Sequence, residues 1–289
     1  MTAPDGSLRP GWVVLTMGTR PDELGACLRS IEHQDATGPV LVVAQGVDVA
    51  VPAGVDILRL EDNVGIPGGR DAGLKAIDAD VVFFLDDDAR YEDTGVASRV
   101  LGLMERRPGL AAVSLRIVDE AGVTLRRHVP RIGAGSADRS GPVTTFLGGA
   151  CAIRRSAYLD VGGYEADFVY AHEELDLAWR VLDAGWTIEY LAEPAVVHPH
   201  VPIAGVDEYR WRLLGRNRVW LARRRLPHPI DWVHSLIWLA VGWMRARSGP
   251  RRRSYAAGWW SGWRGDVARD PMAWATVWRM SRRGRPPLV

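Results

Sequence analysis

The sequence predicts an α/β fold with a mostly parallel central sheet and a helical C-terminal extension. Short apolar runs alternate with helical patterns along the first part of the chain, as in parallel, doubly wound sheets. One run, Val81–Leu85, contains only β-branched, aromatic and aliphatic residues, as expected of a strand that is buried on both faces. From residue 206 onward the composition changes, because this part holds 18 Arg, only five acidic residues and ten of the 13 Trp.

Composition divides the 289 residues into three segments, which is compatible with one large domain and an appendage. We expect residues 1–11 to form a flexible tail, residues 12–205 the α/β domain, and residues 206–289 the basic, Trp- and Arg-rich helical extension. The two cysteines, Cys27 and Cys151, provide neither a disulfide framework nor a metal-spaced pair. The sequence shows no charged stretch followed by an apolar stretch of the kind that forms a secretory signal. We therefore expect a cytoplasmic, reducing location.

Apolar periodicity and the positions of Pro and Gly predict the individual elements of the α/β domain. A helix opens at Pro21, and its apolar residues at i, i+3, i+4 and i+7 are Leu24, Cys27, Leu28 and Ile31. A second helix begins near Glu173, carries an apolar stripe and ends at Gly185. A third helix is predicted at 95–106, and strands are predicted at 12–16, 40–44, 56–60, 81–85, 110–115, 146–153, 186–191 and 195–197.

Three adjacent carboxylates, Asp86, Asp87 and Asp88, follow the buried strand where it reaches the carboxyl edge of the sheet. Ligands of open α/β sheets bind at this edge. Adjacent like charges repel each other, so keeping all three ionised requires a cation. In an extended backbone Asp86 and Asp88 point to the same side, and Mg²⁺ or Mn²⁺ prefers such oxygen ligands. The alternative interpretation is a solvated acidic turn.

A second acidic group begins the helix near residue 173. Acidic residues in a first turn are stabilised by the helix dipole, which gives a purely structural interpretation of the group. Asp176 lies four residues before Arg180, the spacing of a structural ion pair. Glu173 and Glu174 have no such partner in the sequence, so either is a candidate general base. His198, at the end of a predicted strand, is a candidate third metal ligand because Mn²⁺ accepts imidazole.

A glycine cluster, Asn63-x-Gly65-x-x-Gly68-Gly69-Arg70, lies between a predicted strand and a predicted helix. Glycines here allow a ligand to approach the backbone closely, and the start of a helix favours an anion. The cluster lacks the Gly-Lys-Ser/Thr of a Walker loop and the spacing of a dinucleotide fingerprint. A tight structural loop explains it nearly as well. The polar segment 126–145 is either a mobile loop over a site or an ordinary surface connection.

Taken in order, these motifs resemble those of the family 2 glycosyltransferases of the GT-A fold, over residues 12–225. The motifs that carry the resemblance are the first-strand turn ending in Arg20, Asn63-x-Gly65 with Gly68-Gly69-Arg70, Asp86-Asp87-Asp88, Gly148-Gly149, Glu173-Glu174-x-Asp176-Leu177-x-x-Arg180, and His198. The resemblance implies a Rossmann-like GT-A domain that binds a nucleotide sugar over the first half of the sheet. It also implies that Asp86, Asp88 and His198 hold Mg²⁺ or Mn²⁺.

The resemblance also implies roles for single residues. Glu174 stands where the family usually has its catalytic Asp, with Glu173 as a rival, and it would act as general base in an inverting displacement. Many relatives have Asp or Asn at the position of Ala44 to read the nucleobase, so the donor base (uracil, thymine or guanine) is left open. The implied donor-binding residues are Thr16, Arg20, Asn63, Gly65, Gly69, Arg70 and Asp87, and the implied acceptor-side residues are Gly148, Gly149 and Asp176.

The basic extension contains one long apolar run, the 15 residues from Ile230 to Met244. A membrane-spanning helix needs about 20 mostly apolar residues, so this run is too short to span. Its flanking Trp and Arg residues suit a segment that lies in the membrane interface and is attracted by anionic lipid. The alternatives are a buried helix that packs on the α/β domain, a dimer contact, and solvated Arg side chains. No motif supports binding of nucleic acid.

The sequence therefore predicts a metal-dependent inverting glycosyltransferase with a hydroxyl acceptor, either a cell-envelope glycan or a lipid-linked glycan. We expect it in the cytoplasm, with peripheral contact to the inner face of the plasma membrane through residues 206–289. A nucleotidyltransferase is a second hypothesis, but Met17-Gly18-Thr19-Arg20 is a poor version of the phosphate loop that it needs. A membrane-associated scaffold that binds nucleotide sugars without turnover is a third, and the three acids Asp86, Asp88 and Glu174 argue against it.

Overall fold

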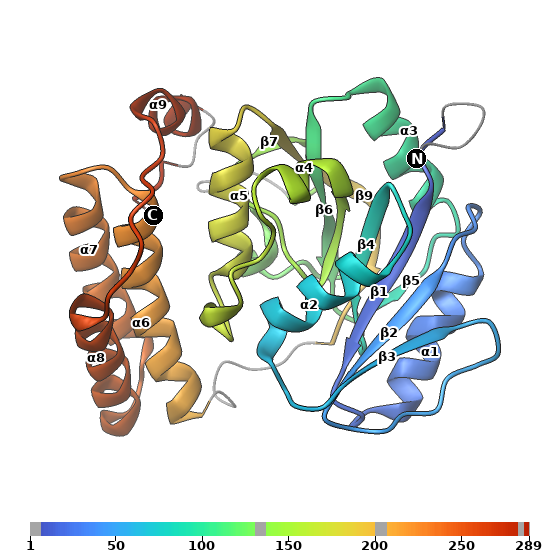
Figure 1. The fold of residues 1–289 in the computed structure, drawn as a ribbon, viewed down its shortest axis with the longest axis horizontal. Helices are drawn as coiled ribbons and strands as arrows, with labels where there is room; N and C mark the ends of the chain where they lie inside the picture. The colour runs from blue at the N-terminus through green and yellow to red at the C-terminus, as the bar shows by residue number, and fades with distance from the viewer. Residues whose placement is uncertain (1–6, 131–136, 200–206, 283–285, 289) are drawn as a thin grey trace.

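The computed structural model describes residues 7–130, 137–199, 207–282 and 286–288. Within them one sheet runs in the order β3-β2-β1-β4-β8-β6-β9-β5, and β7 pairs with β9 (Figure 1). Six strands run in one direction, and β5, β7 and β8 run in the other, which confirms the mostly parallel α/β fold. The strands are β1 (Pro10–Thr16), β2 (Val40–Gln45), β3 (Asp56–Leu60), β4 (Val81–Asp86), β5 (Arg90–Tyr91), β6 (Leu110–Val118), β7 (Gly141–Val143), β8 (Ala150–Arg154) and β9 (Thr187–Val197).

Helices flank the sheet and continue beyond it as a separate group, coloured orange to red in Figure 1. The helix α5 lies between the sheet and this C-terminal group. Apolar residues of α6 and α9 belong to the same buried cluster as residues of the sheet and of α5, so part of the extension packs on the α/β domain. The helices are α1 (Pro21–Glu32), α2 (Gly65–Ala76), α3 (Val96–Arg106), α4 (Arg155–Asp160), α5 (Glu173–Asp183), α6 (Glu208–Arg225), α7 (Ile230–Arg245), α8 (Gly249–Arg264) and α9 (Trp274–Arg282), with short 3-10 turns at Arg126–His128 and Ala166–Phe168.

The buried strand that ends in three carboxylates is present as predicted. Every residue of β4 from Val81 to Leu85 is at most 2% exposed, because β1 and β8 flank the strand in the sheet. The helix α1 buries the four apolar residues that its periodicity identified. The helices α3 and α5 match the sequence predictions within one or two residues, since Gly95 precedes the first and Gly185 follows the second.

Several strand boundaries differ from the prediction. The strand β1 begins at Pro10 rather than residue 12, so the last two residues of the expected tail are part of the sheet, and residues 1–6 lie outside the described ranges. The two strands predicted at 186–191 and 195–197 are one strand, β9, because a register shift against β6 absorbs the extra residues. The strand predicted at 146–153 starts only at Ala150, since Gly148 and Gly149 form a turn.

The glycine cluster is not a loop, and this corrects the interpretation that its glycines admit a ligand. The helix α2 starts at Gly65, so the later glycines lie inside it, and Gly69 and Gly73 face the sheet. A Cβ atom on Gly69 would overlap the Leu15 side chain, and one on Gly73 would lie 2.5 Å from a methyl group of Val13. Their role is therefore to let α2 pack closely against β1.

The C-terminal helix α7 is amphipathic in an unusual sense, since its buried positions are polar or small and its exposed positions are apolar. Residues on the buried face are Asp231, His234, Ser235 and Gly242. Residues on the exposed face are Trp232, Val233, Leu236, Ala240, Trp243 and Met244. Among the helices in the described ranges, none is both long and apolar enough to cross a membrane.

Candidate active site at the carboxyl edge of the sheet

Asp86, Asp88 and His198 form a cluster that could hold a metal ion. One ligand atom from each lies within 4.8 Å of the other two. The imidazole Nε2 of His198 is 3.4 Å from Asp86 Oδ2 and 3.3 Å from Asp88 Oδ1. The sheet creates this meeting, because β5 pairs with the end of β9 and so sets Arg90 opposite Val197. Two carboxylates and one imidazole are ligands that Mn²⁺ accepts, and they also suit Mg²⁺ with added water or phosphate oxygens.

The electrostatics of the cluster favour a cation. Burial alone lowers the pKa of His198, but its hydrogen bond to Asp86 and the charges of Asp86 and Asp88 outweigh burial and raise it to about 9. Burial alone raises the pKa of Asp86, but His198 and the positive charge of Arg70 lower it to about 2. Protonated His198 thus supplies positive charge between the carboxylates, in the place that a divalent ion would take.

Asp87 points away from this cluster, as the alternation of an extended chain requires. The hydroxyl of Thr16 at the end of β1 donates a hydrogen bond of 2.7 Å to Asp87 Oδ2. The Arg20 guanidinium lies 3.4 Å from Asp87 Oδ1 and also contacts the carboxylate of Asp88. Burial is the main cause that raises the pKa of Asp87. These contacts therefore connect the end of β1 to the acidic turn that follows β4.

Arg70 connects the metal-ligand cluster to the candidate base. Its guanidinium is buried, lies 3.0 Å from Asp86 Oδ1 and 3.2 Å from Glu174 Oε1, and is 3.8 Å from Glu173 Oε1. Burial disfavours its charge, but these carboxylates outweigh burial and raise its pKa above the ordinary value. One cation from α2 therefore holds acids from β4 and α5 in fixed positions, a role that its place in a glycine cluster did not indicate.

The structure distinguishes the two glutamates that begin α5. The Glu174 side chain is 24% exposed and lines a cavity, whereas the Glu173 side chain is 2% exposed. Burial and the neighbouring Glu174 raise the pKa of Glu173 well above its usual value. Glu173 Oε2 has no hydrogen-bond partner among the described residues. Glu173 is therefore a buried carboxyl group whose surroundings disfavour its charged form, and Glu174 is the glutamate that a substrate can reach.

The turn Gly148-Gly149 brings backbone against these charged side chains. A Cβ atom on Gly148 would overlap Arg70 and lie 2.5 Å from Glu174 Oε1. A Cβ atom on Gly149 would overlap the carboxylate of Asp86. The side chains of Arg70, Glu174 and Asp86 therefore occupy the space beside this Gly pair, whose residues the family resemblance assigns to the acceptor side.

Other predicted site residues have structural contacts instead. Asp176 is fully buried, with one oxygen 2.7 Å from Arg180 and the other 2.7 Å from Arg225. The Asn63 side chain accepts a hydrogen bond of 2.9 Å from the backbone N–H of Gly65. Gly69 is covered by Leu15. The structure does not bring Asp176 or Gly69 to the cluster, and it uses Asn63 and Gly65 to begin α2.

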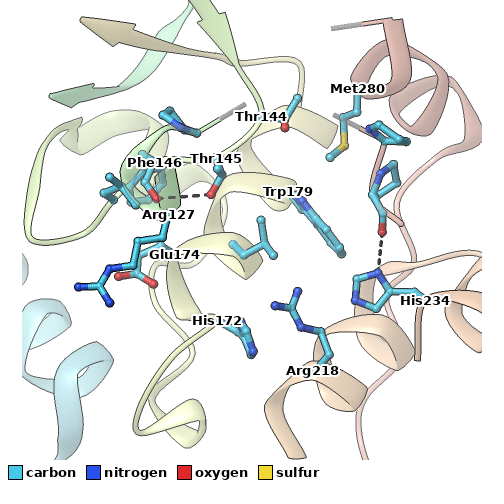
Figure 2. Close-up of a pocket in the computed structure, with 15 residues that line it drawn as sticks. Arg127, Thr144, Thr145, Phe146, His172, Glu174, Trp179, Arg218, His234 and Met280 are labelled. Atoms are coloured by element: carbon cyan, nitrogen blue, oxygen red, sulfur yellow. Dashed lines mark hydrogen bonds between the residues drawn. The ribbon is translucent and has the colours of Figure 1, made fainter. Parts of the chain in front are cut away.

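A cavity of about 180 Å³ adjoins Glu174 on the side of the C-terminal helices (Figure 2). Figure 2 shows Arg127 and Glu174 on one side, His234 and Met280 on the other, and Trp179 and Arg218 between them. Sequence reasoning missed His172, Arg218 and His234, because they lie at the start of α5, in α6 and in α7, and no local motif joins them. The described residues that line the cavity are Arg127, Pro130, Thr144, Thr145, Phe146, Leu147, His172, Glu174, Leu175, Trp179, Arg218, His234, Met280, Pro286 and Pro287.

Comparison with known proteins places the chain in one family. The sequence model of glycosyl transferase family 2 matches residues 13–162, just over half of the chain. The chain is 27% identical over 155 residues to a pre-mycofactocin glycosyltransferase of Mycobacterium tuberculosis, a match that covers 50% of this chain and 32% of that protein. It is 27% identical over 144 residues to an O-antigen chain rhamnosyltransferase of Salmonella anatum, which covers 46% of this chain and 45% of that protein. The matched regions thus span a third to a half of these relatives.

A solved structure gives the same fold at low sequence identity. The mannosyltransferase of Pyrobaculum calidifontis, in complex with GDP-Man and Mn²⁺, superposes with a TM-score of 0.59. The alignment covers 98% of this chain and 81% of that one at 15% identity. At this identity the likeness shows the fold, including helices beyond the sheet.

The raised pKa of the buried Glu173 leads to a prediction about stability and pH. The pKa of Glu173 is higher in the folded protein than in the unfolded chain, where it is about 4.3. Between these two pKa values the folded protein holds a proton that the unfolded chain has released. The free energy of unfolding therefore falls as the pH rises from the lower pKa through the higher one. Glu173→Gln removes this titration. We expect the free energy of unfolding of the variant, measured in urea at pH 5 and pH 8, to decrease less between the two pH values than that of the wild type. Exposed Glu120→Gln is the control, and an equal pH dependence in all three proteins would contradict a raised pKa of Glu173.

Proposed function

The chain belongs to glycosyl transferase family 2, and from this premise we propose that it transfers a sugar from a nucleotide-sugar donor to a hydroxyl acceptor with the aid of Mg²⁺ or Mn²⁺. The observation that carries the proposal is the Asp86, Asp88 and His198 cluster, which Arg70 links directly to Glu174. The similar structure in complex with GDP-Man and Mn²⁺ supports this combination of donor and metal. It leaves the nucleobase of the donor of this chain open.

Asp86, Asp88 and His198 are the residues that would hold the ion. When bound, the ion supplies charge neutralisation for the departing diphosphate. Arg20 and Thr16 fix the turn that carries these acids, and we assign them, with Asp87, to the donor side of the site.

Glu174 is the proposed general base. It takes the proton of the acceptor hydroxyl as the hydroxyl oxygen attacks the anomeric carbon of the donor sugar. The bond to the diphosphate breaks in the same displacement, so the configuration at this carbon is inverted. Arg70 holds Oε1 of Glu174 at 3.2 Å and thereby sets the carboxylate at the edge of the cavity. Glu173 is not suited to this role, because its side chain is only 2% exposed and cannot reach a substrate.

The two other hypotheses from the sequence make different predictions. A nucleotidyltransferase needs a basic residue free to bind phosphate after the first strand, but Arg20 at this place is engaged with Asp87 and Asp88. A scaffold would bind the nucleotide sugar and release no nucleoside diphosphate. Turnover therefore separates a scaffold from the proposed enzyme.

Asp88→Ala tests the metal site. The measurement is the thermal stabilisation of the protein by UDP, GDP and their sugar nucleotides, with and without Mn²⁺. We expect one nucleotide class to stabilise the wild type in a Mn²⁺-dependent way. Loss of one of three ligands should weaken Mn²⁺-dependent nucleotide binding by at least about tenfold. The control Asp56→Ala removes an exposed carboxylate on β3 and should behave as wild type. Unchanged Mn²⁺ dependence in Asp88→Ala would refute the metal assignment.

Glu174→Gln tests the general base. The amide keeps the shape and the contact with Arg70 but cannot accept a proton, so donor binding should persist while transfer falls by about 10²- to 10⁴-fold. Glu173→Gln is the matched control on the same helix and should retain most activity, because the Glu173 side chain is buried away from the substrate. The measurement is release of nucleoside diphosphate against donor affinity. Wild-type turnover in Glu174→Gln would assign the base to another residue.

We propose a glycan or lipid-linked glycan as the acceptor and peripheral membrane contact through the C-terminal extension. The name of the Salmonella anatum relative, an O-antigen chain rhamnosyltransferase, supports a cell-envelope glycan. The exposed apolar face of α7 supports the membrane contact, with Leu236 and Met244 56% and 66% exposed. Arg245 follows at the end of the helix, and Arg residues open α8, so the apolar face is flanked by positive charge. This combination favours the surface of an anionic bilayer.

Leu236→Glu combined with Trp243→Glu tests the membrane contact. The wild type should co-sediment with vesicles of phosphatidylcholine that contain phosphatidylglycerol, and less at high salt. The double variant should bind at least about tenfold more weakly, because two side chains lose apolar burial. Leu159→Glu, at an exposed apolar position in α4, is the matched control. No binding by the wild type, or equal loss in the control, would contradict the proposed face.

A further inference from the structure

The cavity beside Glu174 has a composition that metal and donor binding do not explain. Its volume of about 180 Å³ is roughly six times the volume of a water molecule in the liquid. Most of its described wall, from His172 to Pro287, lies beyond the residues 13–162 that match the family. The C-terminal extension thus contributes to a space that opens next to the proposed base.

Two polar atoms in the cavity wall have no partner among the described residues. They are Thr144 Oγ1 and His234 Nε2, and both side chains belong to residues that are 1% exposed. Buried polar atoms are almost always satisfied by protein, by water or by a ligand. Thr144 comes from the segment between β7 and β8, and His234 comes from α7. The α/β domain and the C-terminal extension therefore each present to the same cavity one polar atom that has no partner among the described residues.

The hydrogen-bonding character of His234 follows from its other ring nitrogen. His234 Nδ1 lies 2.7 Å from the carbonyl oxygen of Pro287, which can only accept, so Nδ1 carries the hydrogen. Burial lowers the pKa of His234 to about 3, so the ring is neutral. Nε2 is therefore an acceptor, and it requires a donor from the occupant of the cavity. The hydroxyl of Thr144 can both donate and accept.

The rest of the wall combines apolar and aromatic side chains, among them Phe146, Leu175, Trp179 and Met280, with the charged side chains of Arg127, Glu174 and Arg218. Apolar walls with a few fixed polar atoms are typical of small-molecule sites. A saccharide has apolar C–H faces and hydroxyl groups that each donate and accept. We infer that this cavity binds the acceptor, and that the acceptor is a saccharide whose hydroxyl groups bond to Thr144 Oγ1 and His234 Nε2 while another hydroxyl lies at Glu174. This inference rests on the proposed function.

Binding of methyl glycosides tests the inference without knowledge of the natural acceptor. The probes are the methyl glycosides of glucose, galactose, mannose and rhamnose, added to the Mg²⁺-loaded protein, because Mg²⁺ is diamagnetic and leaves the histidine resonances sharp. Binding is followed through the ¹⁵N resonances of the histidine side chains, because His234 Nε2 reports directly on a new hydrogen bond. We expect at least one glycoside to shift the Nε2 resonance of His234.

Two cavity variants and two matched controls make the test specific. Thr144→Val keeps the shape and removes the hydroxyl, and it should weaken binding of that glycoside by about fivefold, the equivalent of one hydrogen bond. His234→Phe removes the acceptor nitrogen and should abolish the His234 signal together with measurable binding by calorimetry. Exposed Thr37→Val and His33→Phe should leave both readouts unchanged. If His234→Phe does not fold, Thr144→Val decides alone.

The outcomes separate this inference from the proposed function. Mn²⁺-dependent stabilisation by nucleotide is measured on the same proteins and should be equal in wild type, Thr144→Val and His234→Phe. If nucleotide stabilises the wild type but no glycoside shifts His234, or if Thr144→Val binds the glycoside as wild type does, the cavity holds ordered water only and the inference is overturned. If nucleotide has no effect on the wild type, the proposed function fails whatever the glycosides do.

Discussion

The buried guanidinium of Arg70 is the interaction on which the site depends. Its nitrogen atoms lie 3.0 Å from Asp86 Oδ1 at the end of β4 and 3.2 Å from Glu174 Oε1 at the start of α5. The guanidinium therefore fixes the position of the proposed metal ligand relative to the proposed base. Two conditions make this arrangement possible. Close packing of α2 on β1 requires Gly69 and Gly73, and the turn that passes over the guanidinium requires Gly148. A buried cation with carboxylate partners on two elements fixes their relative position more firmly than exposed ion pairs would.

Charge in this site is balanced before any ligand arrives. Arg70, Arg20 and His198 lie among the acids that follow β4, and the raised pKa of His198 shows how strongly these acids attract a positive charge. A divalent ion that binds to Asp86, Asp88 and His198 takes over part of this balance. The raised pKa of Glu173 fits the same account, because burial and the neighbouring Glu174 both disfavour a charge on its carboxyl group.

The C-terminal extension has an inner face and an outer face with different surroundings. Its inner face packs on α5 and completes the cavity beside Glu174, with His234 and Arg218 in the wall. Its outer face presents the apolar side chains of α7. This explains why α7 buries Asp231 and exposes Leu236, an inversion of the usual pattern for a helix in a soluble domain. An acceptor that binds in the cavity of a protein held at a bilayer would be presented close to the lipid surface.

The sequence by itself determined the α/β class, the buried strand that ends in Asp86, the helix that begins at Glu173 and the ion pair of Asp176 with Arg180. These features depend on contacts between near neighbours in the chain, so local periodicity and spacing encode them. Only the tertiary structure decided which carboxylates face a common site, that Glu173 is buried while Glu174 is accessible, and that Arg70 bridges two elements. It also decided that the glycine cluster lies in a packed helix and that α7 turns its apolar face outward. These outcomes depend on burial and on pairs of residues about 50 to 110 positions apart, such as Arg70 with Glu174, and no local pattern specifies which distant side chains meet.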